Sequence, residues 1–423
     1  MPPRAVTVLL ALLLVLSAMP DTMAAPVLKE VFVDRYGASI REAQFFMAAN
    51  LLGAAAAIPA IVWLRRRFGP VGMLVAGSLA DALLLGVLAA PIGLKASLAV
   101  RAAEGVTDVV VFASLFDLVR RVSGPHAARG LGFASTPLLL GLGAGAVAGG
   151  LAAQRVGPAA DGGSGADVAV AVFGVSAMAS VAVAMGALAF RRWLGAAAAI
   201  EPERGPAAAS GESHAASVPR GPLDDRPRPL AWSCAMAFFD RATGGLITTT
   251  LPSVLAQFLG YGARERGWLV GLPLLLMALC TGPAGALCDR VGSLRVRLLA
   301  GVAYAAAFAA LPWAASSQWA LGAAMTAVGV AAGLLFASSI ALAAETGRGT
   351  VALGAFRAAG DLGFFAGTAL SIAVVAALGG DGEPGYPDYA WTIVLFACAH
   401  AASTAAIAAL ARRASRAARP DPA

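Results

Sequence analysis

Three ionisable residues share one face of Leu98–Leu118, an apolar stretch long enough to cross a bilayer. On an α-helix with 3.6 residues per turn, Arg101, Glu104 and Asp108 fall within about 60° of one another, and Arg101 and Asp108 are about 10 Å apart along the axis. A charge near the middle of a bilayer costs about 2.5–3.5 kcal/mol on insertion scales. The cluster therefore predicts a protein interior or a water-filled cavity on that side of the helix.

Carboxyl groups placed in this way are candidate proton carriers, because withdrawal from water favours the protonated form while a nearby arginine favours the ionised form. Glu104 and Asp108 are the first candidates, and a static Arg101–Glu104 ion pair that only stabilises the fold is the alternative. Asp21 and Asp240 are further candidates for contact with a substrate or a proton. Asp240 and its neighbour Arg241 could instead pair across helices.

Membrane helices must position these residues, because the composition is that of a polytopic membrane protein. The chain has 423 residues, of which 59% are hydrophobic and 13% charged, with a mean hydropathy of +0.77, whereas about 25% charged residues is usual for soluble domains. The net charge of +7 fits loop arginines that orient a membrane protein better than nucleic-acid binding. Four cysteines without ligand spacing and three scattered histidines predict no metal site.

Twelve apolar segments are expected to span the membrane. The first could be read as a secretory signal, but a counterpart of its end later in the chain favours a retained helix. The segments lie near 5–30, 43–64, 71–92, 96–119, 130–153, 166–190, 230–258, 267–288, 295–315, 318–343, 351–378 and 389–411. The expected fold is all-α, with twelve transmembrane helices forming two six-helix bundles related by a pseudo-two-fold axis.

The two halves repeat, which favours parallel bundles around a midplane site. Pro26-Val27-Leu28 has a counterpart in Pro252-Ser253-Val254-Leu255. Lys and Arg are concentrated in the loops on the side that holds both termini, so we expect both termini in the cytoplasm. The expected domains are 1–190 (first bundle), 191–229 (disordered cytosolic linker), 230–411 (second bundle) and 412–423 (basic tail).

The segment from Gly285 to Arg295, GALCDRVGSLR, resembles the G-x-x-x-D-R-x-G-x-x-R loop of the major facilitator superfamily. The resemblance implies that Gly285, Asp289, Arg290 and Gly292 form a gate on the cytoplasmic side. The alternative is that Asp289 and Arg290 merely cap a loop.

Two further elements resemble the same family. Arg101-Ala102-Ala103-Glu104-Gly105 resembles its fourth-helix R-x-x-[QE]-G element, which implies a role for Arg101 in proton coupling. The run from Gly145 to Gly150 resembles a fifth-helix glycine element of its exporters, with Ala146 in place of proline. In this run, Gly145, Gly149 and Gly150 are expected to pack helices closely. Arg357 and Asp361, four residues apart, suit a gate or a structural bridge.

The sequence therefore predicts a secondary transporter, most simply one for proton-coupled efflux of a small, largely hydrophobic compound or metabolite. Proton-coupled uptake of a small solute is the alternative, and a non-transporting membrane sensor or scaffold is another. We expect no enzyme activity, because no nucleophile or phosphate-loop motif is present, and no cofactor beyond a proton gradient. The expected partners are a small-molecule substrate and the lipid bilayer, with no nucleic acid and no obligate protein partner. The expected location is the inner (plasma) membrane.

Overall fold

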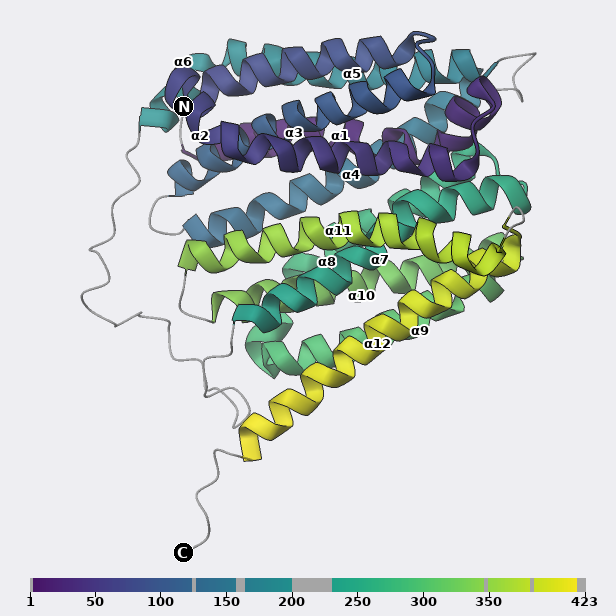
Figure 1. Cartoon of the computed structure of the whole chain (residues 1–423). Coiled ribbons are helices and arrows are strands. Elements are labelled where there is room, and N and C mark those ends of the chain that lie inside the picture. The colour runs from purple at the N-terminus through teal and green to yellow at the C-terminus, as the bar shows by residue number, and fades with distance from the viewer. Residues whose placement is uncertain are drawn as a thin grey trace, which may run out of the picture. The chain divides into compact units, whose positions relative to one another are not determined.

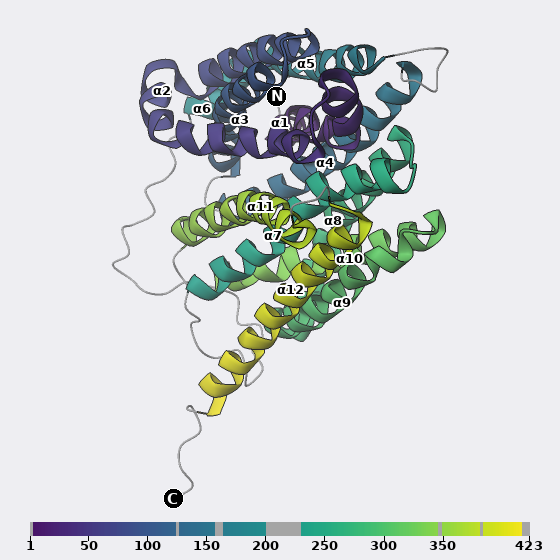
Figure 2. The same ribbon diagram turned by 45° about the vertical axis from the view of Figure 1, so that its right-hand side comes forward.

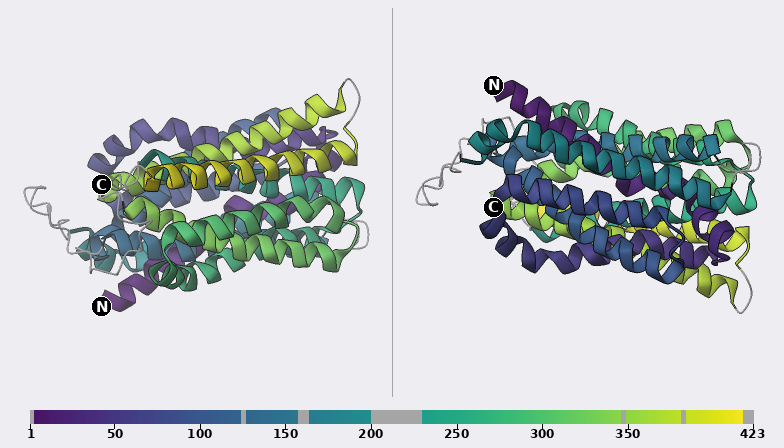
Figure 3. Two further views of the ribbon diagram at one scale, coloured as in Figure 1. Left: turned by 90° about the horizontal axis from the view of Figure 1, so that it is seen from below. Right: turned by 90° about the horizontal axis from the view of Figure 1, so that it is seen from above.

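A computed structural model describes residues 3–123, 127–156, 164–199, 230–345, 349–380 and 384–416. Within these ranges the regular structure is entirely helical, and no strand occurs (Figure 3). A helix satisfies its backbone hydrogen bonds internally, which a chain in hydrocarbon requires. The all-α prediction is confirmed.

Eleven of the described α-helices exceed twenty residues, and α2 contains two predicted spans in succession (Figure 1). Each of the twelve predicted spans coincides with one of these helical segments. By length and composition, nine described segments could cross a membrane. The helices are α1 (Pro3–Met23), α2 (Ile40–Ala89), α3 (Leu94–Ser123), α4 (Ala127–Val156), α5 (Gly165–Ala189), α6 (Arg191–Ala199), α7 (Leu230–Phe258), α8 (Ala263–Val291), α9 (Ser293–Ala314), α10 (Gln318–Ala344), α11 (Gly349–Gly379) and α12 (Tyr386–Arg416).

Helix α2 reverses direction at Gly69, whose φ of 65° is a conformation that favours glycine. Contacts with α3 show the reversal. Arg65, before the turn, pairs with Asp117 of α3 (3.1 Å), whereas Asp81, beyond it, reaches back to Thr107 (3.0 Å). The second and third predicted spans therefore both pack on α3 and are joined by a turn of minimal length.

Two compact units share α7 and α8. One unit contains α1 to α6 together with Ile247–Leu275, which covers the end of α7 and the start of α8. The other contains α7 up to Leu246 and the chain from Leu276 onward. In the second unit α9 lies beside both α10 and α12 (Figure 2). The predicted bundle boundaries, 1–190 and 230–411, stay a prediction.

The linker predicted over 191–229 begins with a helix, which differs from the disorder expected there. Arg191–Ala199 forms α6, with Leu194 and Ala197 buried. Arg121 Nη1 donates to the Ala198 carbonyl oxygen (2.6 Å). Apolar residues at a helical spacing thus give this segment a buried face. The rest of the linker lies outside the described residues, and the predicted tail 412–423 begins as helix, since α12 continues to Arg416.

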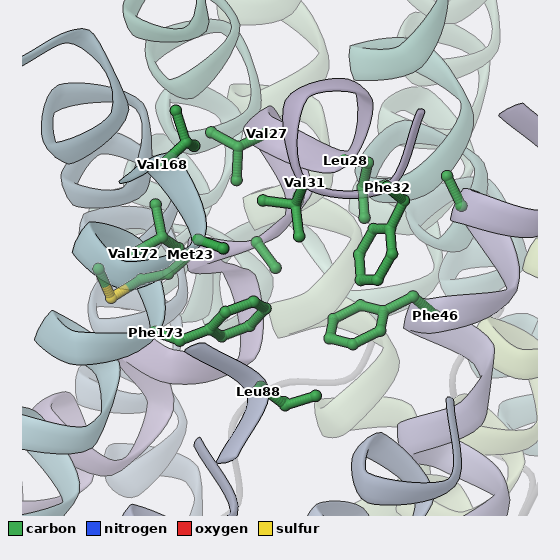
Figure 4. Packing of buried hydrophobic residues seen from close by; sticks show 14 of the residues in the cluster. Met23, Val27, Leu28, Val31, Phe32, Phe46, Leu88, Val168, Val172 and Phe173 are labelled. Carbon is green, nitrogen blue, oxygen red and sulfur yellow. The ribbon is translucent and has the colours of Figure 1, made fainter. Parts of the chain in front are cut away.

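An aromatic core holds α2 and α5 against Lys29–Asp34, a short helical segment that follows α1, in the first unit (Figure 4). The Phe32 and Phe46 ring centroids are 4.6 Å apart, and those of Phe46 and Phe173 are 5.9 Å apart. All three side chains are almost fully buried. Because such pairs add to the burial of apolar area, this core fixes the part of α2 that carries Phe46.

Close helix packing at glycines brings α4 against α1. A Cβ at Gly145 would overlap the Met19 carbonyl oxygen, and a Cβ at Gly149 would overlap that of Met23. Gly150 faces α8 instead, where a Cβ would lie 3.0 Å from the Cα of Gly267. The three glycines predicted to pack helices therefore lie at close contacts between helix backbones within the first unit.

Candidate functional site

Three carboxyl groups meet in the first unit, one from α1 and two from α3. Oxygen atoms of Asp21, Glu104 and Asp108 lie within 4.8 Å of one another. Glu104 and Asp108 are buried, and Asp21 is partly buried with its Oδ1 atom shielded and without a hydrogen-bond partner among the described residues. The face predicted from helical spacing is thus turned toward protein, and Asp21 joins it from α1.

Arg101 neutralises part of this cluster. Its guanidinium forms an ion pair with the Glu104 carboxylate and donates from Nη2 to the Asp21 carbonyl oxygen (3.3 Å). It also lies 5.1 Å from the centroid of the Phe46 ring, which ties the aromatic core to the site. The Arg101 residue is 1% exposed, so its position is set by these contacts and by packing.

Asn50 of α2 completes the cluster, although it is not among the residues predicted from the sequence. Its Nδ2 atom lies 2.7 Å from Glu104 Oε2 and 2.7 Å from Asp108 Oδ2. An amide nitrogen carries two hydrogens, so it can donate to both carboxyl groups at once. A single asparagine in an apolar segment was the available signal. It gave no partner, because helix pairing is not visible in one sequence.

Gly105 explains how Asn50 comes so close. A Cβ at Gly105 would overlap the Asn50 carbonyl oxygen, and a Cβ at Gly53 would overlap the Ala102 carbonyl oxygen. The backbones of α2 and α3 are therefore nearly in contact at both glycines, as small residues permit. The glycine that follows Glu104 in the predicted motif has a positioning role.

Asp81 of α2 lies beside the cluster, between α3 and α5, and it was also not predicted as a site residue. Its Oδ2 atom accepts from the Ser180 hydroxyl of α5 (2.6 Å), and its Oδ1 atom is 3.0 Å from the Thr107 hydroxyl. Thr107 lies between Glu104 and Asp108 on α3, so a buried polar layer continues from the cluster toward α5. Asp81 is 4% exposed.

Asp240 belongs to a different group, in the second unit. Arg297 Nη2 of α9 donates to Asp240 Oδ1 (2.7 Å), and His400 Nδ1 of α12 is 3.7 Å from the same oxygen. The Tyr304 ring lies 4.8 Å from His400, between centroids. Asp240 thus pairs across helices, which is the alternative predicted for it.

The predicted gating residues lie at two places in the second unit. Asp289 and Arg290 are exposed near the end of α8, and Gly292, with φ 98°, separates α8 from α9. Gly285 is partly buried in α8. No ion pair involves Asp289 within the described ranges. Their gating role stays a prediction.

Arg357 and Asp361 pair along α11. The Arg357 Nε atom lies 3.1 Å and 3.0 Å from the two Asp361 carboxylate oxygens. The two side chains are 43% and 49% exposed. The geometry is that of a local bridge on one helix, and whether it acts as a gate stays a prediction.

Known proteins share features of this chain at the level of sequence family and of fold. Residues 230–423 match the family model described as Major Facilitator Superfamily. A structure of a bacterial homolog to the human lysosomal transporter Spinster, in an inward-facing and unoccupied conformation, matches with a TM-score of 0.69 and 16% identity over 100% of both chains. The chain has the major facilitator fold. The resemblance expected from the sequence is confirmed.

Two further structures support the major facilitator fold. Tetrameric PepTSo2 matches with a TM-score of 0.67 and 12% identity, over 98% of this chain and all of that one. A D-xylose-proton symporter matches with a TM-score of 0.67 and 14% identity, over 94% and 97% of the two chains. No curated protein sequence matches the chain. The chain is a multi-pass integral membrane protein.

Proposed function

We propose that this protein is a proton-coupled secondary transporter in which Asp21, Glu104 and Asp108 bind the coupling proton beside Arg101. The observation that carries the proposal is the meeting of these three carboxyl groups around one guanidinium inside a membrane protein. Intramembrane ionisable groups commonly mark ion or proton pathways. The major facilitator fold supplies a scaffold in which such a site alternates between the two sides of the membrane.

Charge balance supports a proton as the ligand. With all three carboxyl groups ionised, one guanidinium would leave two negative charges without compensation in a buried site, at a cost of several kcal/mol for each. Binding a proton lowers that cost. A divalent cation is less suitable, because Arg101 already pairs with Glu104 and Asn50 donates to both Glu104 and Asp108.

For the direction of transport and the substrate, we propose what the sequence predicts. Efflux of a small, largely hydrophobic compound is favoured by the fifth-helix glycine run, which resembles an exporter element. Uptake is the second candidate, because one structural neighbour is named a D-xylose-proton symporter. A non-transporting sensor remains the third. The site itself serves either direction.

Transport in inside-out vesicles tests the proposal. Purified protein is reconstituted, an acidic lumen is imposed, and the uptake of a panel of small hydrophobic fluorophores is followed, with a pH-sensitive dye in the lumen. Efflux by antiport predicts fluorophore accumulation coupled to proton exit. Glu104→Gln and Asp108→Asn should abolish proton movement while the protein remains folded.

Asp34→Asn is the matched control, because Asp34 lies outside the cluster and pairs with Lys29 at the surface. Proton movement in the direction of solute flux would establish uptake instead. Unchanged proton coupling in both Glu104→Gln and Asp108→Asn would contradict the proposed site. Loss of folding in these variants alone would favour the static ion pair.

A further inference from the structure

Arg241 lies on α7, which is predicted to span the membrane, and none of the ion pairs found among the described residues involves its guanidinium. Asp240, its neighbour in sequence, is held by Arg297 on α9, and successive residues on a helix point about 100° apart. Within the described ranges no ion pair or hydrogen bond from the Arg241 guanidinium is found. A charge in a membrane helix without a partner is a functional-site candidate by default.

Aromatic and glycine residues pack around Arg241. Its guanidinium carbon lies 5.7 Å from the centroid of the Phe336 ring on α10. Phe336 in turn lies 6.4 Å from Phe356 of α11, between centroids. A Cβ at Gly360 of α11 would lie 3.2 Å from Arg241 Cγ, so the missing side chain there leaves room for the arginine stem.

The charges around this position sum to a positive value. Arg357 and Asp361 of α11, on either side of Gly360, and Asp240 of α7 are all close enough to act electrostatically on Arg241. Arg357 and Asp361 pair with each other through Arg357 Nε. With Asp240 and its partner Arg297 included, three guanidinium groups and two carboxylates leave one net positive charge close to Phe336 in the second unit.

We infer that Arg241 binds the anionic head of an organic anion whose apolar body lies against the partly buried Phe336. A guanidinium offers a planar pair of donors that matches a carboxylate or sulfonate, and its face can remain on the Phe336 ring. The inference rests on the proposed transport function and narrows its substrate class to compounds with an acidic head group. It uses none of the residues of the proton site.

Binding of naphthalene-2-sulfonate to the purified full-length protein in detergent tests the inference, with naphthalene-2-sulfonamide as the neutral probe of nearly equal shape. Titration calorimetry should show binding of the sulfonate and at least about tenfold weaker binding of the sulfonamide. Arg241→Gln should weaken sulfonate binding by at least about tenfold and leave sulfonamide binding unchanged. Equal sulfonate affinity in Arg241→Gln, or no sulfonate binding to the unaltered protein, would overturn the inference.

Asp361→Asn provides a test that does not depend on the folding of the Arg241 variant. Removing the competing carboxylate should tighten sulfonate binding severalfold, and unchanged or weaker binding would overturn the inference. Glu104→Gln separates this site from the proton site, since it should bind sulfonate normally while losing proton movement in vesicles. Sulfonate binding without any proton coupling in the unaltered protein would contradict the proposed function and leave the anion site standing.

Discussion

At the scale of single residues, the candidate site depends on a few hydrogen-bond donors that hold its carboxyl groups. Glu104 and Asp108 share one amide donor, Asn50 Nδ2, and Glu104 also receives the Arg101 guanidinium. Hydrogen bonds to buried charged groups contribute more to stability than neutral ones, and removing one partner leaves a desolvated group behind. The cluster should therefore respond sharply to small changes in its donors.

Asn50→Leu keeps the side-chain volume and removes the shared donor. We expect it to destabilise the protein by about 1–3 kcal/mol at neutral pH. The loss in free energy of unfolding should be smaller in acid, because protonated carboxyl groups depend less on a hydrogen-bond donor. Thermal unfolding in detergent across pH measures both effects. A pH-independent difference would show that Asn50 acts through packing alone.

Breaking the Asp240–Arg297 pair from one side should cost more than removing both charges. Arg297 is 1% exposed and the Asp240 side chain 18% exposed, so Asp240→Asn or Arg297→Met alone leaves a largely buried charge unpaired and should cost about 3–5 kcal/mol. The double variant should cost less than the sum of the two, as measured by unfolding in a double-mutant cycle. Lys29→Met, which removes a partly exposed partner of Asp34, should cost about 0–1 kcal/mol.

At the scale of elements, helix periodicity was enough to place Arg101, Glu104 and Asp108 on one face, because three residues on one helix need no knowledge of its neighbours. Periodicity could not identify Asn50 or Asp81 as site residues. Their roles depend on which helix packs beside α3 and on how the two helices are aligned along their axes. The glycine runs indicated close packing but not their partners. The structure pairs α4 with α1 and with the start of α8.

Gly105→Ala tests the contact between α2 and α3. The added Cβ would overlap the Asn50 carbonyl oxygen, so the helices must separate and the shared donor must leave the carboxyl groups. We expect loss of stable, monodisperse protein, measured by fluorescence-detected size exclusion. Gly174→Ala in α5 is the control, because nothing lies within 4 Å of its Cβ position, and it should be neutral or stabilising by about 0.5–1 kcal/mol.

The start of α2 offers a pH-dependent test outside the membrane-spanning segments. Hydrogen bonds from the Ser39 backbone and hydroxyl lower the pKa of Glu42 below its ordinary value. A lowered pKa in the folded state contributes stability that is complete above the unfolded pKa and is lost as pH falls through the folded value. Ser39→Ala should therefore lower the melting temperature at pH 7, and the part due to Glu42 should disappear in acid. An equal deficit at both pH values would leave only the loss of the helix cap.

At the scale of the whole molecule, the apolar composition and the number of predicted spans were enough to predict an all-α membrane fold. Residue patterns alone could not show that the end of α7 and the start of α8 would pack with α1 to α6. In the first unit Arg266 of α8 pairs with Glu30, which follows α1 in the chain. Arg266 is 1% exposed and the Glu30 side chain is 14% exposed, so this largely buried ion pair holds the start of α8 in place.

Arg266→Gln should loosen the start of α8 from the rest of the first unit. Ala263, which packs partly buried against the aromatic core, provides the reporter as Ala263→Cys. Maleimide labelling at this position should rise severalfold when Arg266→Gln is added, because an unpaired buried charge destabilises the packed arrangement. Arg264→Cys, at an exposed position, should label equally in both backgrounds. No change at position 263 would show that packing alone holds the segment.

The single-residue turn at Gly69 has a consequence for how the protein enters the membrane. Asn50 lies ahead of the turn and Asp81 beyond it, both on α2. With no loop between them, the translocon must receive the two segments as one helical hairpin, its tip held back by Arg65, Arg66 and Arg67. Asn50 and Asp81 would then enter the bilayer together.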